Sequence, residues 1–502
     1  MAFENNTVRS EVFKHFSTEE QQKYFGLKLK NVIHGIDTLY FTIFLKEQED
    51  KVSQMLKQLE IWKDEYKSGN DDLFFNDMQY LPFHFCHYEH CFRVENMFDI
   101  FIASYLPNPD TPRVVVQLRS IGLWLKHYEN LIPQAVNEFF KFIDCFSIKI
   151  EKIRINRIDY AYHTNLIQNT SKYFSDAVLL NNLKTKLRIY QKVGKITDRI
   201  EVDYLSLGNR KSNNIFFRAY NKSREVVEKQ YKGFFINLWY DEGLISYYDK
   251  YCLEKGYKAG SYNVAQIARI DFYLEYGTDF NLKAKLADLR QKCYENSDNY
   301  TYIRKTLRGL LPEITNIMNI EYQCKSKFFK TFDNEIQSLP SGIHSFVGDV
   351  EPLLVPMYKL LRSTRVVTDY LLKEIVCFKD KDGDYLYWWK RILQCKVCTV
   401  YKGELHREYI NGIDMERLKS KIVNSLAGMS IYKNNVNRQD LTSDIADFIC
   451  VLNDNDIANI TINPETGQAL EFKYKDYDKI KKRKARQIKP LLNKGNVANE
   501  TS

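Results

Sequence analysis

The chain has 502 residues, of which 44% are hydrophobic and 27% charged, an ordinary balance for a globular protein. This composition excludes wholesale disorder, and the length allows two or three domains. The formal net charge of +9 is small for such a length, so it favours a polyanionic partner only weakly. Ten cysteines without a dense framework are typical of proteins in a reducing cytosol.

The N-terminal sequence is polar and acidic, with no apolar run behind it, so we expect no signal peptide. The longest apolar runs fall short of the roughly 20 residues that a bilayer-spanning helix needs. The sequence therefore predicts a soluble cytoplasmic protein without a membrane segment.

Residues 1–30 predict a helical extension that begins at Ser17, where Ser-Thr-Glu-Glu resembles a capping box. Residues 31–335 predict one α+β unit, an antiparallel sheet with helices on one face, in which a half-unit is duplicated. Its first expected elements are a buried strand over Gly35–Leu45, a helix over Val52–Trp62, a bent strand over Val114–Leu125 and an amphipathic helix over Asn130–Phe146.

The segment Ile153–His163, IRINRIDYAYH, alternates with the period of a strand. Ile158, Tyr160 and Tyr162 share the face that would be buried. Arg157, Asp159 and His163 share the other face, where folding alone does not require them.

A second Arg-Ile-Asp follows about 110 residues later, in Gln266–Glu275. Read as a strand, it places Arg269, Asp271 and Glu275 on one open face. Asp159 and Asp271 on adjacent strands would offer two carboxylates, which are hard oxygen ligands suited to Mg²⁺ or Mn²⁺. The alternative is that each aspartate forms a surface ion pair with an arginine of a neighbouring strand.

The strand predicted at Ile215–Asn221 places Arg218, Tyr220 and Lys222 on one face, an arrangement that can bind phosphate. The preceding turn, Gly208–Asn213, adds Arg210 and Lys211, although an exposed hairpin with solvated charges explains the pattern equally well.

A tyrosine nucleophile needs a nearby cation or base that eases ionisation of the phenol. The chain has 35 tyrosines, so their number identifies none of them. The candidates that follow the second Arg-Ile-Asp are Tyr294, Tyr300, Tyr302 and Tyr322.

Residues 345–478 predict a mainly helical C-terminal domain, and residues 479–502 a basic, disordered tail whose cations could bind nucleic-acid phosphates. Two groups suggest zinc only weakly. His84, Cys86, His87 and Cys91 would fall on opposite faces of a strand, and the pair Cys395 and Cys398 has no second pair at finger spacing.

With these residues in view, the chain resembles the replication initiation factor family, the Rep_trans-type rolling-circle initiators of plasmids, filamentous phages and integrative elements. The matching segments fall within residues 31–330 and occur in the family's order: GIDTLYFTIF, VQLRSIGLWL, NRIDYAYH, LGNRKSNNIFFRAYNKSRE and ARIDFYLE. His163 stands where many members have a second Asp, and Asp271 replaces the more usual Glu.

The resemblance implies a relaxase-like DNA nicking-closing enzyme. A tyrosine would attack the origin phosphodiester, leaving a 5′-phosphotyrosine and a free 3′-OH, with a carboxylate-bound Mg²⁺ or Mn²⁺. The implied metal ligands are Asp159, Asp271, Glu275 and His163. The implied catalytic residues are Tyr302, Tyr300 and Tyr322, in that order, with Lys222 and Arg218. The implied DNA contacts are Arg157, Arg210, Lys211, Arg269, Lys481, Lys482 and Arg483.

The expected partners are single-stranded or hairpin origin DNA, a host helicase and a second copy of the chain. The main alternative is a non-catalytic DNA-binding protein of a mobile element with the same fold. A tyrosine recombinase would need a late arginine-rich helical site, and a histidine-type relaxase would need a His-x-His motif, which does not occur in this sequence.

Overall fold

The computed structural model describes residues 15–26, 31–46, 49–85, 87–108, 111–168, 170–196, 200–329, 351–395, 458–462 and 469–474. The chain divides into two compact units, Met1–His406 and Arg407–Ser502. In the second unit, β14 (Ala458–Ile462) and β15 (Ala469–Tyr474) form an antiparallel pair. The elements discussed below belong to the first unit.

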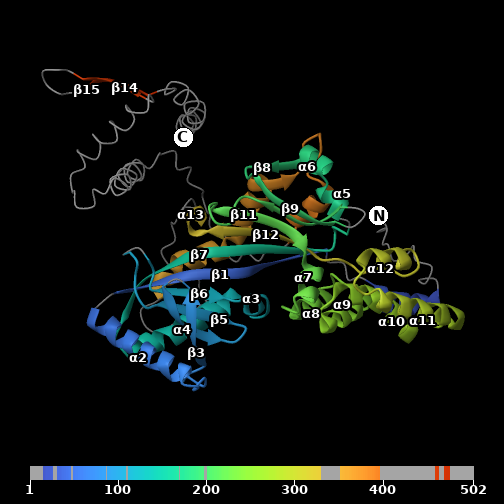
Figure 1. The fold of residues 1–502 in the computed structure, drawn as a ribbon, viewed down its shortest axis with the longest axis horizontal. Helices are drawn as coiled ribbons and strands as arrows, with labels where there is room; N and C mark the ends of the chain where they lie inside the picture. Colours follow the sequence, from blue (N-terminus) through green and yellow to red (C-terminus); the bar gives the residue numbers. More distant parts are fainter. Residues whose placement is uncertain are drawn as a thin grey trace. The chain divides into compact units, whose positions relative to one another are not determined.

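The described part of the first unit is built on one eleven-stranded sheet, and each pair of neighbouring strands is antiparallel (Figure 1). The predicted α+β class with a large antiparallel sheet is confirmed. In sheet order the strands are β2 (Phe74–Phe75), β3 (Met78–Phe85), β4 (Tyr88–Val94), β5 (Phe98–Ala103), β6 (Val114–Leu118), β1 (Val32–Lys46), β7 (Lys149–Thr164), β12 (Met318–Lys325), β11 (Ile215–Asn221), β10 (Ile200–Leu207) and β9 (Ile189–Ile196).

One face of this sheet is apolar because branched and aromatic residues alternate along its strands. Leu39, Phe41 and Ile43 of β1 are fully buried on this face and belong to the main hydrophobic core. Helices α2 (Glu49–Lys67) and α4 (His127–Asp144) pack into the same core, which confirms the helices predicted in those two segments.

A group of helices forms a second hydrophobic cluster, which includes Ile33 of β1, Ala161 of β7 and Trp124. The helices of this group are α7 (Lys222–Glu228), α8 (Phe234–Asp241), α9 (Tyr247–Ala259), α10 (Tyr262–Tyr276), α11 (Phe280–Glu295) and α12 (Tyr300–Leu307). The N-terminal helix α1 (Thr18–Phe25) joins them, and its capping box between Ser17 and Glu20 is formed as predicted.

The strand predicted over Gln266–Glu275 is wrong, because this segment is the middle of helix α10. Ser261 caps the helix by accepting a hydrogen bond from the backbone N–H of Val264, and the helix ends before Gly277. Most of its side chains are buried, so apolar residues occur on several sides and hide the helical period. The second Arg-Ile-Asp is therefore no repeat of the first.

The bent strand predicted over Val114–Leu125 is a strand only as far as Leu118. Its second half is helix α3 (Ser120–Leu125), whose side chains Ser120 and Trp124 contact Asp37 of β1.

Residues 351–395 pack in the same unit as the sheet, whereas the sequence placed them in a separate helical domain. Strand β13 (Val376–Phe378) pairs with β8 (Leu183–Thr185), and the hydroxyl of Tyr322 donates to the carbonyl of Val376 at 3.1 Å. The remaining elements are α5 (Thr170–Phe174), α6 (Asp176–Asn182), α13 (Ser326–Phe329), α14 (Glu351–Arg362), α15 (Thr364–Tyr370), the π-helical η3 (Leu371–Ile375) and α16 (Tyr387–Leu393).

None of the helices in the described ranges combines the length and the apolar character needed to cross a membrane. The basic residues Lys481, Lys482 and Arg483 lie outside the described residues, as do Cys86 and Cys398.

Candidate active site

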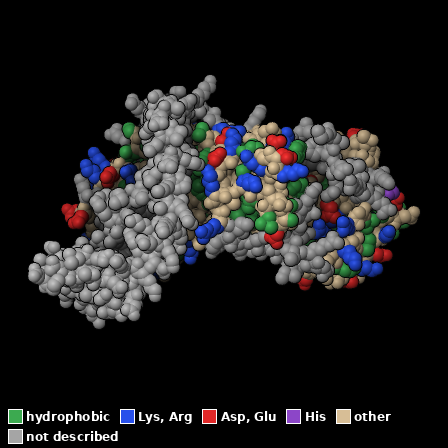
Figure 2. Space-filling model, turned by 90° about the horizontal axis from the view of Figure 1, so that it is seen from above, with side chains coloured by type: hydrophobic (Ala, Val, Ile, Leu, Met, Phe, Trp, Pro, Cys, Tyr) green, Lys and Arg blue, Asp and Glu red, His purple; other side chains and the backbone are tan. Residues whose placement is uncertain are grey.

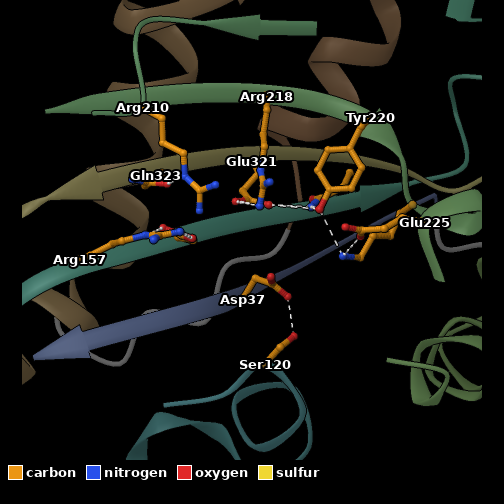
Figure 3. Close-up of polar contacts among 12 residues, drawn as sticks. Asp37, Ser120, Arg157, Arg210, Arg218, Tyr220, Glu225, Glu321 and Gln323 are labelled. Carbon is orange, nitrogen blue, oxygen red and sulfur yellow. Dashed lines mark hydrogen bonds and ion pairs between the residues drawn. The ribbon is translucent and has the colours of Figure 1, made fainter. Parts of the chain in front are cut away.

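Four adjacent strands in the centre of the sheet, β1, β7, β12 and β11, present polar side chains on the face opposite the main core (Figure 3). In the ladders, Gln323 lies opposite Asp159, Glu321 lies opposite Arg218, and Asn319 lies opposite Tyr220. Since directly opposed residues in an antiparallel pair point to the same side, these side chains form one cluster.

Asp159 of β7 is 1% exposed and is held by Arg157, two residues earlier on the same strand. The Nε of Arg157 donates to Oδ1 of Asp159 at 2.7 Å, and Nη2 donates to Oδ2. Burial raises the pKa of Asp159 to about 6, although Arg157 acts in the opposite direction, and the nearby charge of Glu321 adds to the increase. Asp159 is thus a buried carboxylate that holds a proton more tightly than an exposed aspartate does.

Glu321 of β12 is fully buried and forms the centre of the cluster. Its Oε1 accepts a hydrogen bond from Nη2 of Arg218 at 2.6 Å, and its Oε2 accepts one from Nδ2 of Asn319 at 3.0 Å. Glu321 and Asp159 lie on neighbouring strands, offset by two residues, so the cluster contains two buried carboxylates, each with its own arginine.

Tyr220 of β11 places its hydroxyl within this network. The hydroxyl accepts hydrogen bonds from Nδ2 of Asn319 at 2.9 Å and from Nζ of Lys222 at 3.2 Å, and it donates to Oε2 of Glu321 at 3.4 Å. The guanidinium of Arg218 lies 5.0 Å from the centre of the tyrosine ring. Burial raises the pKa of Tyr220, Lys222 lowers it in part, and Glu321 raises it further.

Lys222, the first residue of α7, is 1% exposed, and its Nζ also donates to Oε2 of Glu225 at 2.6 Å. Burial disfavours its charged form. The nearby Tyr220, Asp37 and Glu225 outweigh that effect and hold the pKa of Lys222 above its ordinary value. The lysine is therefore a permanent cation beside the Tyr220 hydroxyl.

Asp37 lies at a bulge in β1 and joins the cluster to the helices around it. Its carboxylate accepts hydrogen bonds from Oγ of Ser120 at 2.6 Å and from Nζ of Lys232 at 3.0 Å. Burial opposes its ionisation, but Lys232 and Lys222 hold the pKa of Asp37 well below its usual range. Tyr231 and Lys232 line a neighbouring cavity of about 620 Å³.

The structure confirms the two faces predicted for the first Arg-Ile-Asp strand. Ile158, Tyr160 and Tyr162 are buried in the main core, and Arg157 and Asp159 are on the opposite face. It also confirms the strand Ile215–Asn221, where Phe217 and Ala219 are in the core while Arg218 and Tyr220 face the cluster.

Asp271, Glu275 and Arg269 lie on α10, away from this cluster. Asp271 is paired with Arg290 of α11, and Glu275 accepts a hydrogen bond from the Tyr251 hydroxyl at 2.8 Å. Arg269 is fully buried and donates to the carbonyl of Leu311 at 2.7 Å. The prediction that Asp159 and Asp271 lie on adjacent strands is wrong because the second segment is helical.

The tyrosines ranked as nucleophiles also lie elsewhere. Tyr300 and Tyr302 are on α12, which packs against α10 in the second hydrophobic cluster. Tyr294 is on α11, where its hydroxyl donates to Asp271. Tyr322 is on β12 but points into the main core, so its hydroxyl faces away from Glu321.

His163 is on the same face of the sheet as the cluster, but aromatic rings surround its side chain and shield it from solvent. Its ring stacks on Trp124 at 4.8 Å, and its Nδ1 accepts a hydrogen bond from Nε1 of Trp239 at 3.1 Å. Burial holds the pKa of His163 well below its ordinary value. The imidazole is neutral and enclosed, which does not suit the metal-ligand role expected for it.

The cations of the turn before β11 border the cluster. The Nε of Arg210 donates to Oε1 of Gln323 at 3.2 Å, and Nζ of Lys325 donates to the backbone carbonyls of Arg210 and Lys211 at 2.7 and 2.9 Å. On the face drawn in Figure 2, the described Lys and Arg side chains are interspersed with Asp and Glu, so that face shows no extended field of one charge sign.

Sequence reasoning missed Glu321 and Asn319, and it did not consider Tyr220 as a nucleophile. A signal for them was present, because Met318–Lys325 alternates polar and apolar residues in the pattern of a half-buried strand. Both carboxylates of the site therefore come from strands, but the second belongs to β12.

The cluster can be tested for its fit to a divalent metal. The described residues contain no group of three or more His, Cys, Asp or Glu side chains placed to hold a metal ion, which also gives no support to zinc at His84, His87 and Cys91. Asp159 and Glu321 do supply two carboxylates. The buried Oδ1 of Asn319 has no hydrogen-bond partner in the described structure. In the β7–β12 ladder, however, Asn319 lies four residues along β12 from Gln323, the partner of Asp159, so its amide oxygen is too far along the strand to share a cation with Asp159. Asp159 and Glu321 alone are a partial ligand set for Mg²⁺ or Mn²⁺, which commonly complete their shells with water and substrate phosphate.

Comparisons with known proteins give a limited result. No protein-family profile matches the chain, and no curated protein matches its sequence. Among solved structures, the chain is similar to a rolling circle replication initiator protein from Geobacillus stearothermophilus, with 12% identity and a TM-score of 0.34, over 74% of this chain and all of that one.

Proposed function

We propose that this protein is a DNA strand-cleaving initiator of rolling-circle replication in which Tyr220 is the nucleophile. The observation that carries the proposal is the position of the Tyr220 hydroxyl, which contacts both Lys222 and Glu321 on the face opposite the main core. An attacking phenol needs a group that accepts its proton and a cation that stabilises the phenolate, and these two residues supply both.

In the proposed reaction, a bond forms between the Tyr220 oxygen and phosphorus, and the bond from phosphorus to the 3′ oxygen breaks. Glu321 takes the phenol proton, and the 3′ oxygen leaves as a hydroxyl after gaining a proton from solvent. The products are a 5′-phosphotyrosine and a 3′-OH that can prime synthesis. Arg218, whose guanidinium lies over the tyrosine ring, directs the phosphate to the hydroxyl.

Asp159 and Glu321 would hold a divalent cation in this proposal, with water and the DNA phosphate completing its shell. Such a cation polarises a phosphodiester and offsets the charge that develops on its oxygens. Its binding requires Asp159 to be ionised, which places the working range above the pKa of about 6 of this carboxyl group.

The test is covalent capture. The protein is incubated with Mn²⁺ and single-stranded oligonucleotides tiled across the DNA that flanks its gene, and the products are separated under denaturing conditions. We expect one oligonucleotide to give a protein–DNA adduct, and mass spectrometry to locate the nucleotide on Tyr220. Tyr220→Phe should form no adduct, whereas Tyr302→Phe should react like the unmodified protein. An adduct on any other tyrosine would contradict the assignment of Tyr220 as the nucleophile.

A second candidate is a DNA-binding protein of the same fold that does not cleave. The burial of Tyr220, which is 7% exposed, and the resulting increase in its pKa favour this alternative. It predicts that the same oligonucleotide is bound with equal affinity by the unmodified protein and by Tyr220→Phe, and that neither forms an adduct with Mn²⁺.

A further inference from the structure

The polar face continues from the candidate active site across β1, β6, β5, β4 and β3. Helices α2 and α4 cover the other side of these strands. Trp62 of α2, for example, contacts Tyr80 and Phe92 with ring centres 5.6 and 5.8 Å apart. Residues that alternate with that core, such as Arg93, Phe101 and Gln117, therefore point to the opposite face.

Several partly exposed aromatic rings lie on this opposite face. Phe83 of β3 and Phe101 of β5 are both partly exposed, and their ring centres lie 4.6 Å apart. Tyr40 and Phe44 of β1 are also partly exposed, and Phe74 at the sheet edge is 51% exposed. Partly exposed rings on a sheet surface do not fill the hydrophobic core. They are free to stack on nucleobases.

Cations accompany these rings. The guanidinium of Arg157 lies 5.5 Å from the Tyr40 ring, and that of Arg154 lies 5.3 Å from the Phe44 ring. Arg93 and Arg119 share a single acid, because each donates from Nε to a different oxygen of Asp99 at 2.8 Å. The side chains of Arg93 and Arg119 remain 35% and 31% exposed, whereas Asp99 is 1% exposed.

One buried acid thus orients two arginines, whose remaining N–H groups and excess charge face outward. Arg157 connects this surface to the active site, because it also holds Asp159. The five interstrand steps from β3 to β7 span about 24 Å, which is enough for several nucleotides of an extended strand.

We infer that this face, defined by Phe83, Phe101, Tyr40, Arg93 and Arg119 and here called the aromatic platform, binds single-stranded DNA by stacking and phosphate contacts. The inference rests on the proposed function in taking DNA as the partner. The inference adds two points to that function. It says where the DNA strand lies beyond the cleaved bond, and it says that the contacts are stacking contacts, which any base can make. Duplex DNA does not fit this mode, since its bases are not free to stack on protein rings.

The test is binding by fluorescence anisotropy, in the Tyr220→Phe background so that no cleavage interferes. The probes are a labelled 20-mer of thymidine, the same backbone without bases, and a 20-base-pair duplex. We expect the double variant Phe83→Ala/Phe101→Ala to bind the thymidine 20-mer roughly five- to a hundredfold more weakly. The matched control is Phe280→Ala, since Phe280 of α11 is 83% exposed and lies off the sheet.

A second variant, Phe83→Leu/Phe101→Leu, keeps apolar side chains at both positions and guards against loss of folding. We expect it to fold with an unchanged circular dichroism spectrum and to lose affinity for the thymidine 20-mer. We also expect the unmodified platform and both variants to bind the abasic strand equally. Equal binding of the thymidine 20-mer by the leucine variant and its parent would overturn the inference, as would the same phenylalanine dependence with duplex.

The outcome is separable from that of the proposed function. A protein that forms no adduct but binds the thymidine 20-mer through Phe83 and Phe101 would lack the cleavage activity and retain the platform. An adduct on Tyr220 together with unchanged binding in the leucine variant would support the cleavage activity and contradict the aromatic platform.

Discussion

The hydroxyl of Tyr220 lies 3.2 Å from the Nζ of Lys222, and both groups are nearly inaccessible to solvent. A buried ammonium beside a phenol favours the phenolate, whereas burial itself and the carboxylate of Glu321 oppose it. Under the proposed function, the reactivity of Tyr220 is set by the balance between the cation of Lys222 and the anion of Glu321, both of which it contacts directly.

Replacing Lys222 by Met removes the cation and nearly preserves the side-chain volume. We expect the pKa of Tyr220 to rise further and the rate of adduct formation to fall at least about tenfold, since one pKa unit corresponds to about 1.4 kcal/mol. Single-turnover rates measured against pH check this, and the rate of the variant should still be increasing at a pH where the unmodified protein has reached its plateau. Lys222→Arg keeps the charge and is the control. A superimposable pH profile in Lys222→Met would show that the ammonium does not act on the phenol.

The proposed metal site predicts that Mn²⁺ binding depends on pH through Asp159. Its pKa of about 6 means that a proton competes with the cation below this pH, so Mn²⁺ affinity should fall by up to tenfold per pH unit between pH 6 and pH 5. Isothermal titration calorimetry measures this directly, and proton release on binding should be detectable in buffers of different ionisation enthalpy. Affinity that does not change from pH 7.5 to 5 would argue against Asp159 as a ligand.

The same carboxyl group has a consequence for stability. Its folded-state pKa of about 6 is above the ordinary value of 3.8, so the folded state binds the proton more tightly. The resulting stabilisation is fully present below pH 3.8 and is lost as the pH rises through 6, by roughly 3 kcal/mol at most. Asp159→Asn cannot titrate, so its advantage over the unmodified protein in chemical denaturation should grow from pH 4 to pH 8. An advantage that shrinks over this range would contradict the direction of the shift.

Substitutions of two acids distinguish the site seen in the structure, which contains Glu321, from the site predicted from sequence, which contained Asp271. Glu321→Gln should abolish adduct formation, because Glu321 contacts Tyr220 and belongs to the proposed metal site. Asp271→Asn should leave adduct formation unchanged and alter the free energy of unfolding by no more than about 1 kcal/mol, since its partner Arg290 is 45% exposed. Adduct yields of the two variants, measured side by side, decide between the assignments.

A comparable contrast exists between two tyrosines. Tyr322→Phe removes a buried hydrogen bond to the carbonyl of Val376 and should cost about 1 kcal/mol of unfolding free energy without changing adduct formation. Tyr220→Phe should eliminate the adduct. A folded Tyr322→Phe variant that forms no adduct would contradict this prediction, because a hydroxyl in the core cannot take part in the reaction.

Much of the central sheet could be predicted from local pattern. The strands that carry Asp159 and Arg218 alternate polar and apolar residues around these positions, which reveals the strand and separates its polar face from its apolar one. The capping box at Ser17 is equally local, because its two hydrogen bonds join residues three positions apart.

The second carboxylate could not be found by matching tripeptides. The segment around Asp271 is buried on most sides, which erases the difference between the strand and helix periods, and the tripeptide shared with β7 has no structural basis. Ser261 and Gly277 marked the ends of a helix and carried the more reliable information. That β12 enters the sheet between β7 and β11 depends on long-range pairing, which no local pattern encodes.

The pairing of each central carboxylate with its own arginine, Asp159 with Arg157 and Glu321 with Arg218, has a consequence for the order of events. A DNA phosphate that attracts the two guanidinium groups weakens their hold on the acids, and the released oxygens become better ligands for a cation. Nucleic acid and metal should therefore promote one another's binding, and the gain must be equal in both directions. Without DNA, each of the two acids is neutralised by its own arginine, so under the proposed function we expect little cleavage until DNA and metal are bound together.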